Sequence, residues 1–212
     1  MKIAIINEVS SCAKNKDVVA AFSETGNEVI NYGMTSPDAS PTLTYIQTSL
    51  MSALVLNMGM ADIVVGGCGT GQGYLNAVMK YPNICCVLIT QPLDAWLAKR
   101  INAPNCISLA LNQGYGWAGD INLKLIASHI CENTPEKGYP PAREESQTES
   151  RKILNQISEN NHKTMVEILQ TLPEEIMKPV FLNSVFISET EHAAESELKR
   201  LVMTMIRKYQ NG

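Results

Sequence analysis

A glycine-rich segment around one cysteine contains the residues in this sequence that are best suited to chemistry. Residues 66–73 read Gly-Gly-Cys-Gly-Thr-Gly-Gln-Gly and lie between an apolar stretch and a helical pattern. In such a loop the backbone N–H groups converge, and the N-terminus of the following helix favours negative charge. Cys68 in this setting is expected to carry substantial thiolate character, and Thr70 adds a hydroxyl group two residues later.

This combination suits the removal of a proton next to a carbonyl group, with the enediolate oxygens held by loop amides. A second interpretation stays open, because free cysteine is often a small buried hydrophobe in a tight turn. The loop lacks the Lys-Ser or Lys-Thr of a Walker phosphate loop, and the dinucleotide pattern G-x-G-x-x-G fails in every register. A nucleotide site is therefore not expected.

Composition and charge argue against several other classes of protein. The 212 residues are 45% hydrophobic and 18% charged, and a net charge of −4 gives no reason to expect nucleic acid or an anionic membrane. No apolar run reaches the roughly 20 residues that a membrane-spanning helix needs. The six cysteines form no Cys-x-x-Cys pair and the three histidines show no ligand spacing. We therefore expect no metal and no disulfide framework, but reduced thiols and a cytoplasmic location.

Apolar runs alternate with amphipathic stretches over the first 130 residues. The alternation predicts an α/β fold, a Rossmann-like doubly wound sheet of about five parallel strands in three α/β/α layers. The ligand is expected beyond the carboxyl ends of the strands, and the continuous apolar run at 85–90 predicts a strand buried on both faces. The predicted strands are 2–6, 29–32, 61–66, 85–90 and 105–110, and the predicted helices are 13–25, 45–58, 74–80, 92–101 and 117–131.

The composition changes after residue 132. A connection containing Pro135, Gly138, Pro140 and Pro141 precedes two amphipathic patterns, which predict helices at 149–171 and 189–208. Pro173 and Pro179 are expected to break the chain between them. We predict a domain of residues 1–132, followed by a helical C-terminal extension of residues 133–212 that packs on this domain or on a partner subunit.

Residues 1 to about 131 resemble the type B ribose-5-phosphate isomerases and the galactose-6-phosphate isomerase subunits. The resemblance rests on residues 1–5, on residues 26–33, and above all on Cys-Gly-Thr-Gly-x-Gly at residues 68–73 after an apolar strand. It implies an aldose–ketose isomerase that works through a cis-enediolate on a small anionic sugar, without a metal or an organic cofactor. It also implies a homodimer or homotetramer whose subunits share active sites.

The resemblance assigns roles to particular residues. Cys68 matches the catalytic base, Thr70 matches a threonine that assists proton handling, and Asn102 matches part of the enediolate site. A branch of the family uses a glutamate farther along the loop, where this chain has Tyr74 and Leu75. The loop residues expected to bind substrate are Gly67, Gly69, Gly71, Gln72 and Gly73.

Three departures from the family pattern affect the expected substrate. Family members usually carry Asp-His after the first strand, where this chain has Asn7-Glu8-Val9-Ser10. Ile101 stands at the position of the ring-opening histidine, and Asn112 at the position of a phosphate-binding arginine. Substitutes are conceivable: Glu8 as an acid/base, Asn7 at the substrate, and a basic residue at the phosphate. The candidates for that basic residue are Lys14, Arg143 and Arg151.

The sequence leaves three functions open. The first, which the family resemblance favours because it is the main class of the family, is isomerisation of a sugar phosphate with substitute residues. The second, an alternative, is isomerisation of an open-chain keto-uronate of the 4-deoxy-5-hexosulose uronate type, which needs no ring opening. The third is a non-catalytic relative that binds a sugar. Elsewhere, Trp96 and Trp117 are expected to be packing residues, and Tyr115 either a substrate contact or a solvated loop residue.

Overall fold

The computed structural model describes residues 1–133 and 138–211. Within these residues the strands form one fully parallel sheet in the order β2-β1-β3-β5-β4. This confirms the predicted doubly wound α/β fold. β2 is added on one side of β1 and β3 on the other, so the strand order reverses between β1 and β3, whose carboxyl ends lie side by side. The strands are β1 Lys2–Asn7, β2 Glu28–Asn31, β3 Ile63–Cys68, β4 Cys86–Ile89 and β5 Cys106–Ala110.

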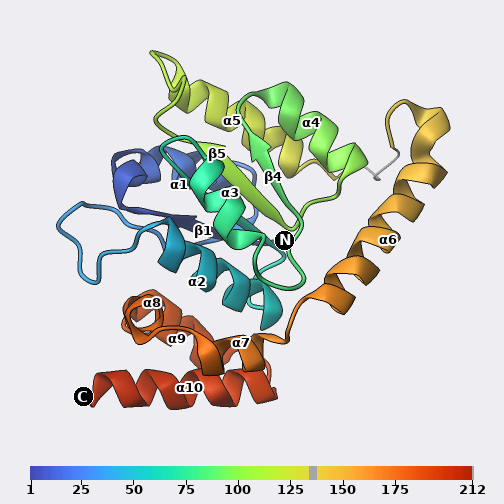
Figure 1. Ribbon diagram of the computed structural model, residues 1–212. Coiled ribbons are helices and arrows are strands. Elements are labelled where there is room, and N and C mark those ends of the chain that lie inside the picture. The colour runs from blue at the N-terminus through green and yellow to red at the C-terminus, as the bar shows by residue number, and fades with distance from the viewer. Residues whose placement is uncertain (134–137, 212) are drawn as a thin grey trace.

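Helices cover both faces of the sheet (Figure 1). Successive strand side chains point to opposite faces, so Ile3 and Ile5 enter one apolar core whereas Ala4 and Ile6 enter the other. The first core lies under α1 Asn15–Ser23, α4 Pro92–Ile101 and α5 Gly119–Ile130. The second lies under α2 Tyr45–Asn57 and α3 Gln72–Val78.

The C-terminal helices form a further layer outside α2 (Figure 1). Every residue of α2 from Thr48 to Val55 is buried, because one side of the helix faces the sheet and the other faces this layer. Phe181 stacks on Tyr209 with ring centroids 6.0 Å apart, and the ring centroid of Phe186 lies 6.1 Å from that of Phe181. The layer consists of α7 Met165–Thr171, α8 Glu174–Phe181, α9 Ser184–His192 and α10 Glu197–Gln210.

Helix α6, Glu144–Asn161, projects from the body as an arm after the short 3-10 helix η2, Pro141–Arg143 (Figure 1). None of its residues is buried. Ile153, Leu154 and Ile157 lie on it with 47%, 61% and 49% of their surface exposed. The arm therefore carries an apolar surface that residues 1–133 and 138–211 leave uncovered.

Several predicted boundaries are wrong for identifiable reasons. β4 is an edge strand with three half-buried residues, not a strand buried on both faces, because β5 lies between it and β3. The predicted helices 149–171 and 189–208 are each split, since the side chains of Thr164 and Ser196 cap new helices, α7 and α10. Pro179 lies inside α8 and does not end it. Pro135 lies outside the described residues, and the division at residue 132 stays a prediction.

No helix among the described residues is both long enough and apolar enough to cross a membrane.

The packing of the C-terminal layer on α2 predicts a large effect of a single truncation. Phe181→Ala should lower the free energy of unfolding by about 3–5 kcal/mol, because Phe181 is fully buried and the cavity cannot close. Leu93→Ala, at a side chain 57% exposed, should change it by less than about 0.5 kcal/mol. Urea unfolding followed by circular dichroism measures both, and equal small effects would mean that the layer is only loosely attached.

Candidate active site

Cys68 is the last residue of β3, at the carboxyl edge of the sheet between β1 and β5. It is paired with Ala110 on β5, and the preceding residue, Gly67, is paired with Asn7 on β1. Only 6% of its surface is exposed. Cys68 thus lies where a doubly wound sheet places its ligand, at the point where the chain order reverses.

The loop after Cys68 is tied down through its carbonyl groups. Gly69 O accepts hydrogen bonds from the backbone N–H groups of Asn112 (2.9 Å) and Gln113 (3.1 Å), and Gly71 O accepts one from Ser108 Oγ (2.6 Å). The N–H groups of Gly69, Thr70 and Gly71 donate to no other described residue. These donors remain available to an anion above the loop.

Thr70 is exposed beside these donors. Its Oγ1 accepts a hydrogen bond from Gln72 N (3.3 Å), so the hydroxyl group can still donate its own proton. Gly71 adopts a positive φ of 74° as the N-cap of α3, a conformation that favours glycine. Gln72 and Gly73 form the first turn of α3, and Tyr45 packs against Gly73. The predicted loop 66–73 is therefore too long: Gly67 lies inside β3, Gln72 and Gly73 lie in α3, and residues 69–71 connect the two elements.

The segment after β1 begins with a 3-10 helix, η1 Val9–Lys14, and not with the predicted loop. Glu8 caps it: the carboxylate accepts a hydrogen bond from Ser10 N (3.1 Å) and another from the Ser10 hydroxyl group. Glu8 is 4% exposed, so it is not the solvated side chain that a loop carboxylate usually is. The two hydrogen bonds fix its position beside the Cys68 loop.

Asn112 connects the loops after β1, β3 and β5. Its Nδ2 donates to Ser10 O (2.9 Å), its Oδ1 accepts from Lys14 Nζ (2.8 Å), and its backbone N–H binds Gly69 O. The sequence comparison had marked Asn112 only as a missing arginine. Its role as a connector depends on contacts between segments almost a hundred residues apart, which no local pattern reveals.

Tyr115 has a structural role in the loop between β5 and α5. Its hydroxyl group donates to Asp17 Oδ2 (2.7 Å), and burial together with this carboxylate raises the pKa of Tyr115 above its usual range. Its ring fills the space next to Gly119. Trp117 in the same loop is fully exposed, so the prediction that it packs within the chain is wrong: α5 begins only at Gly119.

Asn7 is completely buried at the end of β1, and neither its Oδ1 nor its Nδ2 has a hydrogen-bond partner in the described part of the chain. It lies beside Gly67, the residue before Cys68. A buried amide without a partner costs free energy, and such groups are rare in folded proteins. Asn7 is therefore a polar group at the candidate site that a ligand or a water molecule can satisfy.

Asn102, Arg143 and Arg151 are not brought to Cys68 within this chain. α4 starts after the carboxyl end of β4 and runs back, so Asn102 follows it at the amino edge, where its carbonyl accepts from Cys85 Sγ (3.7 Å). Along β5 the two edges are four steps of about 3.3 Å apart. Arg151 donates to Ile101 O (2.9 Å), and Arg143 is exposed on η2.

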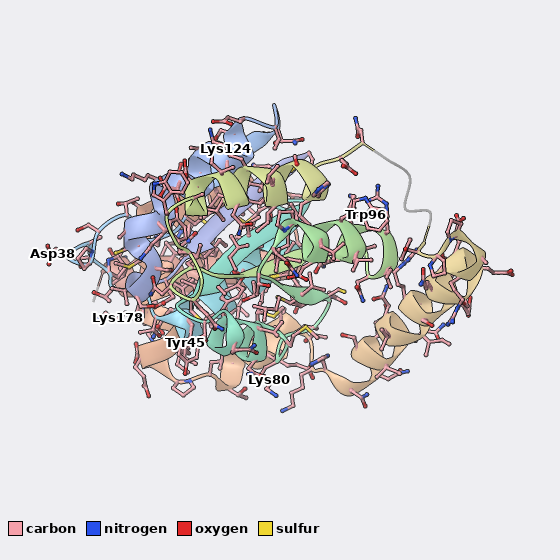
Figure 2. All side chains as sticks on the ribbon, turned by 90° about the horizontal axis from the view of Figure 1, so that it is seen from above. Asp38, Tyr45, Lys80, Trp96, Lys124 and Lys178 are labelled. Atoms are coloured by element: carbon pink, nitrogen blue, oxygen red, sulfur yellow. The ribbon has the colours of Figure 1, made fainter. Side chains whose placement is uncertain are left out.

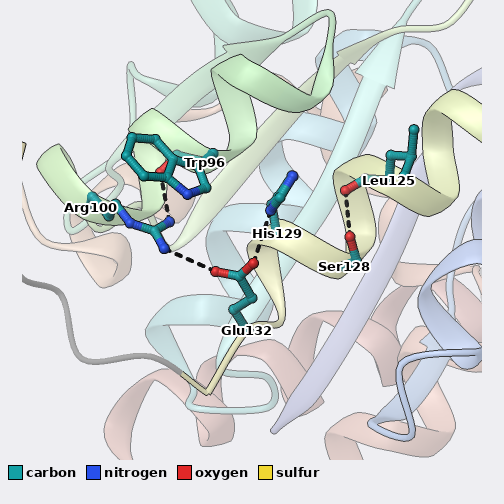
Figure 3. A network of polar contacts seen from close by, with 6 residues as sticks. All are labelled: Trp96, Arg100, Leu125, Ser128, His129 and Glu132. Carbon is teal, nitrogen blue, oxygen red and sulfur yellow. Dashed lines mark hydrogen bonds and ion pairs between the residues drawn. The ribbon is translucent and has the colours of Figure 1, made fainter.

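A polar network on the outer side of the sheet fixes α4 against α5 (Figure 3). Arg100 donates to Glu132 Oε2 (3.2 Å) and lies 4.0 Å over the ring of Trp96, while Glu132 Oε1 contacts His129 Nδ1 (3.0 Å). Trp96 also packs edge-on against Tyr139, and Figure 2 shows Trp96 on α4, on the same side of the molecule as the arm α6. Trp96 is thus the packing residue that the sequence predicts.

Two further cysteines, Cys85 and Cys86, lie away from the site. A hydrogen bond with Cys106 and burial raise the pKa of the Cys86 thiol, and burial raises the pKa of Cys85. Cys86 begins β4 and Cys85 precedes it, so both lie at the amino edge of the sheet, opposite Cys68. Among the described residues no group of three potential ligands could hold a metal ion.

The unpartnered amide of Asn7 predicts an unusual change in stability. Asn7→Leu should raise the free energy of unfolding by about 1 kcal/mol, because it removes a buried amide that lacks a partner. Asn15→Leu is the matched control: Asn15 is also buried, but it exchanges hydrogen bonds of 3.0 and 2.8 Å with Asn31. The Asn15→Leu substitution should lower the free energy of unfolding by about 1–3 kcal/mol. Equal destabilisation by both substitutions, in urea unfolding, would show that Asn7 is satisfied in solution.

Comparison with known proteins places the chain in a family. The ribose/galactose isomerase family model matches residues 3–132. A ribose-5-phosphate isomerase from Vibrio parahaemolyticus is 32% identical with a TM-score of 0.91, covering 99% of each chain. A 4-deoxy-L-threo-5-hexosulose-uronate ketol-isomerase, solved with tartrate, is 30% identical with a TM-score of 0.91, covering 98% of this chain and 100% of its own.

A more distant structure shares the fold. The ribose 5-phosphate isomerase from Thermotoga maritima is 23% identical with a TM-score of 0.57, covering 70% of this chain and 97% of its own. The α/β sheet and the glycine-rich loop thus occur in a chain that is matched by a sugar isomerase model over residues 3–132 and by full-length isomerase structures. The chain belongs to the ribose/galactose isomerase family of intramolecular oxidoreductases.

Proposed function

We propose that this sugar isomerase is a ketol-isomerase in which Cys68 moves a proton between adjacent carbons of a small acidic sugar. The observation that carries the proposal is the position of Cys68 at the carboxyl end of β3, below a loop whose amide donors at residues 69–71 are unused by other described residues. A thiolate base and oxyanion donors are the two requirements for forming an enediolate from a sugar with a carbonyl group.

The reaction then runs in two proton transfers. The Cys68 thiolate takes the proton from the carbon next to the carbonyl group, and the electron pair moves to the carbonyl oxygen to give a cis-enediolate. The amides of residues 69–71 and the unpartnered Asn7 amide stabilise its oxygens, and the Thr70 hydroxyl group moves a proton between them. The Cys68 thiol returns its proton to the neighbouring carbon, which regenerates the thiolate. Glu8, held by Ser10, stays beside this site as a possible second acid/base.

The favoured substrate class is an open-chain keto-uronate. Ile101 stands where the family resemblance expects a ring-opening histidine, and Asn112 where it expects a phosphate-binding arginine. An isoleucine cannot transfer protons, so a substrate that needs no ring opening fits best. The 30% identical relative, which this chain matches over its full length, is a ketol-isomerase of such a uronate.

The second candidate is a phosphorylated sugar, which is favoured by the 32% identical ribose-5-phosphate isomerase from Vibrio parahaemolyticus. This function needs Lys14, Arg143 or Arg151 at the phosphate group. Arg143 and Arg151 lie on η2 and α6, away from Cys68 of their own chain. They would reach a Cys68 site only from another subunit.

We also infer that a second copy of the chain completes the site in a homodimer, or in a homotetramer built from two such pairs. Asn102 lies at the amino edge of the sheet and Cys68 at the carboxyl edge, so one chain cannot supply both to the same substrate. The arm α6 exposes Ile153, Leu154 and Ile157, and a partner surface would cover them.

Isotope exchange tests the chemistry. In D2O the wild-type protein should introduce deuterium next to the carbonyl group of 4-deoxy-L-threo-5-hexosulose uronate, measured by mass spectrometry, with ribose 5-phosphate as the alternative substrate. Cys68→Ser should slow exchange about 100- to 10,000-fold, because it removes the base. Cys131→Ser, at a half-buried thiol outside the site, is the control and should leave the rate unchanged. Absence of exchange with any aldose, ketose or keto-uronate would favour a non-catalytic sugar-binding protein.

Mixing two inactive variants tests whether the site is shared. Cys68→Ala and Asn102→Ala subunits, each inactive alone, should regain about a quarter of the wild-type rate when refolded together, because half of the randomly formed dimers contain one intact site. Size-exclusion chromatography with light scattering verifies that mixed dimers form. Inactive mixed dimers would exclude a site in which Cys68 of one subunit and Asn102 of the other act on the same substrate.

A further inference from the structure

We propose that Lys14 is the specificity-determining residue of the Cys68 site and binds a singly charged carboxylate of the substrate. The inference deepens the proposed function and rests on it for the location of the reacting end of the sugar. The Lys14 side chain is positioned by Asn112, which connects the loops after β1, β3 and β5.

The ammonium group of Lys14 has a fixed position but no counter-ion. Lys14 is half-buried at the end of η1; its Nζ donates to Asn112 Oδ1 (2.8 Å) and lies 5.8 Å from the centre of the Tyr115 ring. No carboxylate among the described residues forms an ion pair with it. An ammonium group has three N–H donors, so two can still be given to an anion.

The Asn112 amide and the Tyr115 ring, which contact the Lys14 ammonium group, are positioned by hydrogen bonds of their own. Asn112 is fixed by its bonds to Ser10 O and Gly69 O, both 2.9 Å, and Tyr115 by its bond to Asp17 (2.7 Å). A free lysine side chain loses considerable rotamer entropy on binding a ligand. Because this side chain is already positioned, less entropy is lost when an anion binds, and the interaction is correspondingly stronger.

A single side chain connects Lys14 to the loop that follows Cys68. Asn112 Nδ2 lies 3.3 Å from the place where a side chain on Gly69 would begin, and Gly69 follows Cys68 directly. Lys14 Nζ donates to the oxygen of the same Asn112 amide. We therefore place the reacting end of the sugar at the Cys68 thiol and its acid group at the ammonium group, with the buried Asn7 amide at the same edge of the sheet.

The neighbouring charges favour a carboxylate over a phosphate. Glu8 and Asp17 lie on the same segment as Lys14, and both are acidic. A phosphate dianion would bring two negative charges next to these carboxylates with one ammonium group to oppose them. A carboxylate brings one negative charge and accepts two hydrogen bonds from the two remaining donors.

Calorimetric titration with small sugar acids tests this inference without turnover. Wild-type protein should bind D-erythronate, a four-carbon carboxylate, more tightly than neutral erythritol or erythritol 4-phosphate. Lys14→Met, which keeps the length of the side chain, should weaken erythronate binding about 10- to 100-fold and leave erythritol binding unchanged, because a charged hydrogen bond is lost. Lys16→Met is the matched control on the exposed side of the same segment and should behave as the wild type.

The outcomes separate this inference from the proposed function. Equal erythronate binding by the Lys14→Met and Lys16→Met variants would overturn the role of Lys14, as would absence of erythronate binding by the wild type or tighter binding of the phosphate ester. Deuterium exchange by the wild type would in each case still support the ketol-isomerase. Loss of erythronate binding in Lys14→Met, together with no exchange on any sugar, would support the carboxylate site and refute the isomerase.

Discussion

The ring of Tyr74 occupies the space that Gly66 leaves above β3, and much of the candidate site depends on this contact. Any side chain at Gly66 would overlap the ring. The Tyr74 hydroxyl group is bonded to Ser52 (2.7 Å) on α2 and contacts Cys106 Sγ (3.4 Å) on β5. One residue thereby joins α3, α2 and β5. These contacts hold the first turn of α3, which follows the loop after Cys68, against β5.

The buried helix α2 extends this order to the C-terminal half of the chain. Because α2 carries apolar residues on the side that faces away from the sheet as well, that side needs a cover, and α7–α10 provide it. The apolar core therefore continues from the sheet through α2 to Phe181 and Tyr209. The Thermotoga maritima structure aligns with only 70% of this chain. The Vibrio parahaemolyticus isomerase and the uronate ketol-isomerase align with 99% and 98% of it.

The sequence predicts the features that depend on local periodicity and leaves out those that depend on contacts between distant segments. The five strands follow from apolar runs. The glycines at 66–73 indicate a loop, but β3 extends through Cys68, so the loop is confined to residues 69–71. The edge position of β4 depends on strand order, which periodicity does not encode. The placement of Asn102 at the opposite edge depends on the direction of α4, and the roles of Asn112 and Lys14 depend on three loops meeting.

The bond between Arg151 and the carbonyl group of Ile101 has a practical consequence for protein engineering. It attaches the arm α6 to the last turn of α4, directly before Asn102. A fluorescent domain or affinity tag inserted into α6 near Arg151 is expected to disturb this attachment and the position of Asn102. Labels belong instead at the C-terminal end of α10, where Gln210 and Asn211 are exposed.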